Sequence, residues 1–211
     1  MATRRALIVA AASPEQLDGI GERPDIVIAA DSGVHAVLAV GWTPDQVVGD
    51  LDSAAPEAID AVADAGAHVD RHPETKNETD LELAIAAAVA AGATEVHVVV
   101  RGDGRLDHQL ANLVSLAHPS WAAAALSASV GEHEVWVVRG ERRLDLEPGR
   151  HLALVPIGGP ATVTSSGVAY PLDAEVLSPF EGRGIANEVT GPVRLDVTDG
   201  VVLALSSPAG D

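Results

Sequence analysis

Hydrophobic positions in the first two-thirds of the chain alternate between two patterns. Short continuous apolar runs predict buried parallel strands, and apolar residues three or four positions apart predict helices between them. The expected strands are residues 6–12, 25–31, 46–50, 67–71 and 95–101. Strands that alternate with helices are typical of βαβ units, so this part of the chain predicts an α/β domain with a parallel sheet.

Helix boundaries are marked by caps and glycines. Thr79 and Glu82 match a capping box, which begins a helix that runs to Gly92. Gly41 and Gly66 follow two earlier helical patterns, where glycine suits the position after a helix end. The last helix of this region carries Leu106, Leu110, Leu113 and Ala117 on one face, and Pro119 closes it.

The pattern changes after about Gly131. Short strands separated by Gly, Pro and Asp turns are expected at residues 134–139, 142–146, 151–156, 161–165, 188–197 and 201–205. No helical pattern remains, which favours an antiparallel β-sandwich. We therefore expect an α/β domain over residues 1–125 and a β-sandwich domain over residues 130–211.

Composition limits the partners. A formal net charge of −18 disfavours nucleic acid, whose phosphates attract basic surfaces. The chain has no cysteine, which excludes a disulfide framework, and it has no apolar run of the roughly 20 residues that a membrane span needs. These features fit the cytoplasm. An acidic protein that binds a polyphosphate needs a divalent cation between its carboxylates and the phosphates.

Acidic residues follow the ends of several predicted strands. Asp31 ends the second strand, Asp50 ends the third with Asp52 two residues later, Asp80 begins the helix after the fourth, and Asp107 follows the fifth. In an open parallel sheet the ligands bind outside the carboxyl ends of the strands, so these acids converge on one edge. Clustered carboxylates repel one another unless a cation neutralises them, and oxygen ligands of this kind suit Mg²⁺.

Each of these residues also has a purely structural explanation. Asp50 and Asp52 could be turn residues before a helix cap at Ser53. Asp80 and Asp107 lie in first turns of helices, where the helix dipole favours an acid. The functional interpretation depends on their occurrence together.

Several segments together resemble one known family, that of thiamine pyrophosphokinase (thiamine diphosphokinase), over nearly the whole chain. The segments are ADSG at 30–33, PDQVVGDLDS at 44–53, HPETKNETDLE at 72–82, GRLDH at 104–108, GVAYPL at 167–172 and GIANE at 184–188. The resemblance implies an α/β ATP-binding domain followed by a β-sandwich that binds thiamine. It also implies a homodimer whose active sites lie between chains.

By this resemblance, pyrophosphate passes from ATP to the hydroxyl of thiamine and AMP leaves. The implied catalytic residues are Asp50, Asp52, Asp80 and Asp107, the first three of which would hold Mg²⁺. The implied ATP-binding residues are Asp31, Lys76, Thr79, Arg105 and His108, and Lys76 is the only lysine of the chain. The implied thiamine-binding residues are Ser166, Tyr170 and Asn187.

Two positions depart from the family pattern near the phosphates. Asp103 stands where a glycine is commoner, and Ser32 replaces a frequent glycine. Asp103 adds a negative charge where the family would place ATP.

Three other functions fit part of the pattern. A pterin alcohol could replace thiamine as acceptor. The residues from Asp50 to Ser53 are similar to the nucleophile motif of haloacid dehalogenase-like phosphatases, although that family places the motif on the first strand. A dimeric metal- or thiamine-binding protein without activity is the third alternative. The nucleotide product formed from ATP and thiamine separates these functions.

Overall fold

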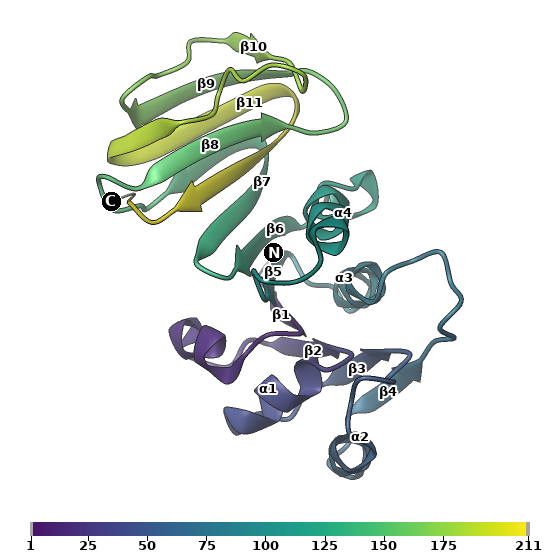
Figure 1. Cartoon of the computed structure of the whole chain (residues 1–211). Helices are drawn as coiled ribbons and strands as arrows, with labels where there is room; N and C mark the ends of the chain where they lie inside the picture. The colour runs from purple at the N-terminus through teal and green to yellow at the C-terminus, as the bar shows by residue number, and fades with distance from the viewer. Residues whose placement is uncertain (1, 210–211) are drawn as a thin grey trace. The chain divides into compact units, whose positions relative to one another are not determined.

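The computed structural model describes residues 2–209, and these fall into two compact units that divide between Gly131 and Glu132 (Figure 1). The first unit contains an all-parallel sheet in the order β6-β5-β1-β2-β3-β4. Its strands are β1 (Arg5–Ala10), β2 (Ile26–Ala30), β3 (Gln46–Gly49), β4 (His68–Arg71), β5 (Glu95–Val100) and β6 (Ala125–Val130). The predicted α/β class is confirmed.

Helices cover both faces of this sheet. Leu7 and Val9 of β1 pack on one face with Val34 of α1 (Gly33–Ala39) and Val62 of α2 (Pro56–Asp64). On the opposite face, α3 (Asp80–Ala90) packs against β1, β2 and β3. Figure 1 shows α1 and α2 on one side of the sheet and α3 on the other. Burial on both faces explains why the strands are continuous apolar runs in the sequence.

The predicted helix boundaries are confirmed. The Glu82 amide donates to Thr79 Oγ1 at 3.2 Å, and the Thr79 amide donates to Glu82 Oε2 at 2.8 Å, so both halves of the capping box form. Gly66 follows α2 with φ of 98°, a left-handed conformation that glycine adopts without strain. The next strand, β4, begins only two residues later.

Three elements of this unit are not predicted by the sequence pattern. A 3₁₀ helix, η1 (Pro14–Ile20), follows β1, and the strand β6 pairs in parallel with β5. A second short 3₁₀ helix, η2 (Pro119–Trp121), follows α4 (Leu106–Leu116). No helix among the described residues is long and apolar enough to cross a membrane.

The second unit is antiparallel. Its strands are β7 (His133–Leu144), β8 (His151–Pro156), β9 (Ala161–Val168), β10 (Glu175–Leu177) and β11 (Asn187–Ser207). The long strand β11 pairs with β7 from Val193 to Ser206. It also pairs with β8 at Asn187 and Glu188, with β9 from Val189 to Asp199, and with β8 again from Val202 to Ser207. The change of partner occurs where the register shifts between Val197 and Val202. The apolar side chains of β7, β8, β9 and β11 enclose one core.

Turn residues in this unit do not always separate strands. Residues 134–139 and 142–146 were expected as two strands, but β7 continues through Gly140, whose φ is 100°. Residues 188–197 and 201–205 likewise belong to one strand, in which Asp199 and Gly200 form an irregularity and not a hairpin turn. A bulge accommodates extra residues without ending a strand, so turn-forming residues alone overstate the number of strands.

Candidate active site

Three carboxylates gather at the carboxyl ends of β2 and β3. Asp31, Asp50 and Asp52 each offer an oxygen, and these oxygens lie within 4.8 Å of one another. The strands are neighbours, and the Asp31 amide continues their pairing by donating to the Val48 carbonyl at 2.9 Å. Adjacent parallel strands therefore bring together acids that are about twenty positions apart in sequence.

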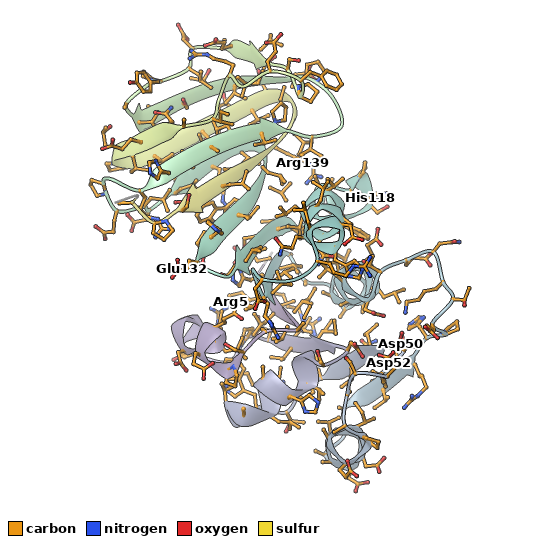
Figure 2. All side chains as sticks on the ribbon, in the orientation of Figure 1. Arg5, Asp50, Asp52, His118, Glu132 and Arg139 are labelled. Atoms are coloured by element: carbon orange, nitrogen blue, oxygen red, sulfur yellow. The ribbon has the colours of Figure 1, made fainter. Side chains whose placement is uncertain are left out.

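The backbone after β3 has an unusual local conformation. Leu51 adopts a φ of 63° while its side chain is only 5% exposed. The Asp52 amide donates to Asp50 Oδ1 at 3.1 Å, which closes a turn over Leu51. A non-glycine residue in this region costs about 1–3 kcal/mol, and such residues persist where the surroundings hold them. Burial of Leu51 thus fixes a turn that presents Asp50 and Asp52 together (Figure 2).

Close approach of backbones supports the same cluster. A Cβ atom at Gly33 would lie 1.9 Å from the Val9 carbonyl oxygen, so only glycine lets α1 begin this near to β1. A Cβ atom at Gly49 would lie 3.3 Å from Asp80 Oδ1 and 3.4 Å from the Asp31 Cβ. The absence of a side chain at Gly49 therefore lets Asp80 and Asp31 both lie close to the backbone just before Asp50.

Hydrogen bonds within the chain satisfy only some of the carboxylate oxygens of the cluster. Ser53 Oγ donates to Asp31 Oδ2, but Asp31 Oδ1 is buried and has no hydrogen-bond partner. The charge of Asp50 raises the pKa of Asp52, with smaller contributions from Asp31 and Glu74. A buried carboxylate oxygen without a donor, beside two more carboxylates, is a donor set that fits a divalent cation such as Mg²⁺.

Lys76 is the cation that lies next to this cluster. Its ammonium is 2.7 Å from Asp80 Oδ1, one helical turn apart in sequence. Burial alone would lower the pKa of Lys76, but the hydrogen bond and charge of Asp80, with Asp50 and Asp31, outweigh burial and raise it. Lys76 is therefore a permanently charged group at neutral pH, held close to the acids.

A pocket of about 520 Å³ adjoins these groups in the first unit. Most of the predicted catalytic and ATP-binding residues line it: Asp31, Asp50, Lys76, Thr79, Asp80, Arg105 and His108. Asp52 and Asp107 are not among its lining residues. The structure thus groups Asp31 with Asp50 and Asp52, whereas Asp80 is paired with Lys76 and Asp107 lies apart.

Two arginine–aspartate pairs flank the start of α4. Arg105 donates two hydrogen bonds to Asp107, at 3.1 and 2.6 Å, and lowers the pKa of that carboxyl. Arg101 holds Asp103 in the same way, with both bonds at 2.9 Å. Arg101 lines the pocket, so the extra acid at position 103 is accompanied by a cation that neutralises it.

The predicted thiamine-binding residues lie in the second unit and are not all available to a ligand. Asn187 is buried, and its side-chain oxygen and nitrogen bond the backbone of Tyr170 at 2.9 and 2.7 Å. Asn187 therefore fixes the segment that carries Tyr170, whose own side chain is exposed. Ser166 lines a different concavity, on β9.

Several residues that line the pocket are not among the predicted site residues, namely Glu74, Arg101, Gln109, Asn112 and Ser32, the last of which was noted only as a departure from the family pattern. Gln109 Nε2 donates to the carbonyls of Gly102 and Gly104, at 3.1 and 2.8 Å, and so shapes the loop before α4. Arg101 ends a predicted strand at the ligand-binding edge, and that position is the signal that could have identified it.

Comparison with family models gives two matches that together cover most of the chain. Residues 19–126 match the thiamin pyrophosphokinase catalytic domain, and residues 133–202 match the thiamin pyrophosphokinase vitamin B1 binding domain. A comparison with curated proteins finds no match.

Solved structures with the same fold include thiamine pyrophosphokinase from Bacillus subtilis, at 22% identity and a TM-score of 0.83, covering 97% of this chain and 99% of that one. A protein from Lactobacillus plantarum is 27% identical, with a TM-score of 0.76 over 99% of this chain and 100% of that one. Thiamin pyrophosphokinase from Candida albicans is 14% identical, with a TM-score of 0.78 over 98% and 90%. The order of the two domain matches and this shared fold agree, and the chain belongs to the thiamin pyrophosphokinase family, whose members are thiamine diphosphokinases.

Proposed function

We propose that the protein is a cytoplasmic enzyme that transfers the pyrophosphoryl group of ATP to the hydroxyl of thiamine, giving thiamine diphosphate and AMP. The observation that carries this proposal is the pocket of the first unit. Its lining contains both carboxylates and the cations Lys76, Arg101 and Arg105. A polyphosphate needs both, since its oxygens bind cationic side chains directly and approach carboxylates only through a metal ion.

Mg²⁺ is the metal that this donor set suits. We propose Asp50 and Asp52 as its ligands, with Asp31 as a further ligand through its unpartnered oxygen and Asp80 at the edge of the site. When bound, the ion would neutralise phosphate charge and stabilise the charge that develops during transfer.

The side chains would then act by positioning and by charge. Lys76 keeps its proton at neutral pH and would bind phosphate oxygens together with Arg105. Phosphoryl transfer depends chiefly on such alignment and neutralisation, with little covalent help from the enzyme. Thr79, at the N-cap of α3, holds its helix start at the pocket wall, and His108 lines the pocket from α4.

The proton of the thiamine hydroxyl needs an acceptor, and Asp52 and Asp107 are the two candidate acids. Arg105 lowers the pKa of Asp107, which makes that carboxylate a weaker base. Asp50 raises the pKa of Asp52, which makes it a stronger one. We propose Asp52 as the acceptor, because it is exposed beside the carboxylate cluster, whereas both oxygens of Asp107 are occupied by Arg105.

Thiamine is favoured over a pterin alcohol because residues 133–202 match the vitamin B1 binding domain. In the second unit the exposed ring of Tyr170 is a suitable surface for an aromatic cation. Asn187 would contribute indirectly, through the backbone that it bonds.

We further propose that the protein is a homodimer in which a second copy covers α4. Leu106, Leu110 and Val114 are 79%, 61% and 45% exposed, and they recur every four residues along one face of that helix. An exposed apolar stripe of this kind marks an interaction site. His108, Gln109 and Asn112 of the same helix line the pocket, so a copy seated on the stripe would lie beside the active site.

The test is to incubate the protein with ATP, Mg²⁺ and thiamine and to identify the products by ³¹P NMR and chromatography. AMP with thiamine diphosphate in equal amounts is the expected result. ADP, or inorganic phosphate without a thiamine ester, would contradict the proposal. A Leu110→Glu variant analysed by sedimentation should shift toward monomer, whereas an unchanged dimer would remove α4 from the interface.

A further inference from the structure

The second unit carries two rows of like charges on one face of its sheet. Arg143 of β7 lies directly opposite Arg194 of β11, and two residues along the same strands Glu141 lies opposite Asp196. Residues directly opposite on antiparallel strands project to the same face, so all four side chains share it. Both arginines and Glu141 are exposed, and Asp196 is half-buried.

This arrangement leaves each pair of like charges at the shortest separation. Opposite Cβ atoms on paired strands are about 5 Å apart, and residues two positions apart on one strand are about 6.8 Å apart. The like charges therefore occupy the shorter separation, which is the least favourable way to place two positive and two negative charges on four such sites. Among residues 2–209, none of these four side chains forms a hydrogen bond or an ion pair that would relieve this repulsion.

Hydroxyl groups and a concavity accompany the charges. On the other side of β11, Ser166 lies opposite Arg194 and Thr164 lies opposite Asp196. These six residues line a concavity of about 440 Å³. Each charge row therefore has one hydroxyl beside it, and the whole arrangement lies in a hollow of a size suited to a small molecule.

We propose that this concavity binds a small zwitterion. Its oxyanion, a phosphate or carboxylate, lies between Arg143 and Arg194, where guanidinium groups bind two oxygens at once. Its cationic group lies about 7 Å away, one strand repeat, beside Glu141 and Asp196. Such a ligand removes both repulsions together, which neither a simple anion nor a simple cation does.

Phosphate esters of cationic alcohols have this chemistry, and two sources can supply them. One is a phosphorylated form of thiamine, whose ring is a cation, and this source rests on the proposed function. The other is an unrelated ester such as phosphocholine. The concavity lies on β7, β9 and β11 and shares no residue with the pocket of the first unit, but it includes Ser166, which the family resemblance implies as a thiamine-binding residue. Binding of an ester unrelated to thiamine does not depend on the proposed function.

The test uses the full chain with EDTA present, so that metal-dependent phosphate binding does not contribute. Phosphocholine is titrated while the backbone amides of Thr164 and Ser166 are followed by NMR, and calorimetry gives the affinity. We expect saturable shifts at these amides. The double variant Arg143→Gln/Arg194→Gln should weaken binding at least tenfold. Arg183→Gln is the matched control, since Arg183 is an arginine of the same unit that is already paired with Glu175.

Further binding measurements distinguish a thiamine phosphate from an unrelated phosphate ester as the ligand. The variant Glu141→Gln/Asp196→Asn should weaken phosphocholine but not inorganic phosphate. Tighter binding of thiamine monophosphate than of phosphocholine at the same amides supports the thiamine source, and equal binding supports a general ester site. Absence of shifts at Thr164 and Ser166 would overturn the proposal. The proposal would also be overturned if the parent protein bound no ligand and the arginine variant changed its oligomeric state. The charge rows would then pair with those of a second copy.

Discussion

Replacing Gly33 by alanine tests how the fold positions the carboxylate cluster. Gly33 begins α1, directly after Asp31 and Ser32. The new methyl group would lie 1.9 Å from the Val9 carbonyl oxygen and 2.7 Å from its carbon. Both atoms are backbone in β1, which pairs with β2 and β5 and cannot rotate away as a side chain would.

The size of the effect follows from these distances. An ordinary contact begins at 3.4 Å, so α1 or β1 must shift by about 1.5 Å. Overpacking in a well-packed region costs about 1–3 kcal/mol, and the upper half of that range applies because no flexible group can yield. A loss of about 2–3 kcal/mol lowers the melting temperature of a chain of this size by roughly 4–12 °C. Asp31 moves with the start of α1, and a misplacement of about 1 Å in a site can cost about 100-fold in turnover.

The assay pairs thermal unfolding with turnover of ATP and thiamine. Gly19→Ala is the control, because a Cβ atom there meets nothing within 4 Å. We expect the control to match the parent protein in both measurements. If Gly33→Ala also keeps the parent melting temperature and turnover, the close approach of α1 to β1 does not position Asp31 and the reasoning is wrong.

Four further predictions follow from the site. Asp52→Asn should lose about two orders of magnitude or more in turnover while its circular dichroism is unchanged, as for other charge-stabilising groups; near-normal turnover would remove it from the metal site. Thr79→Ala should lose about 1 kcal/mol in denaturant unfolding, whereas Thr79→Ser keeps the hydroxyl cap and should not; equal losses would argue against the cap. The raised pKa of Lys76 means that its ion pair with Asp80 stabilises the fold below the ordinary lysine pKa of about 10.4 and is lost as pH rises through the raised value. The stability difference between the parent and Lys76→Met should therefore shrink above about pH 10.4, and a constant difference would contradict this. Tyr170→Ala should raise KM for thiamine more than KM for ATP, and equal changes would argue against ring contact.

Local sequence signals predicted elements well where the local pattern decides the structure. The capping box at Thr79 and the glycine after α2 fix helix ends through groups within a few residues, and both appear as expected. The strand β6 was missed because its sequence, ALSASV, mixes small and polar residues, and pairing with β5 makes it a strand. A tertiary contact of this kind leaves little trace in a short window of sequence.

The apolar face of α4 shows a second limit. The spacing of Leu106 and Leu110 correctly predicts a helix, but not what the helix packs against. Periodicity reports that one face is apolar, and a core and an interface with another chain impose the same pattern. The exposure of these leucines in a single chain is what separates the two cases.

Strand order explains why the predicted acids separate into two places along one edge. The sequence shows that each follows a strand, but adjacency depends on the order β5-β1-β2-β3, which no local pattern contains. Asp31 and Asp50 follow neighbouring strands and therefore meet. Asp107 follows β5, which lies three strand spacings, or roughly 14 Å, from β3, and there it pairs with Arg105. The same order that brings Asp31 into the cluster thus carries Arg105 to the far part of the pocket.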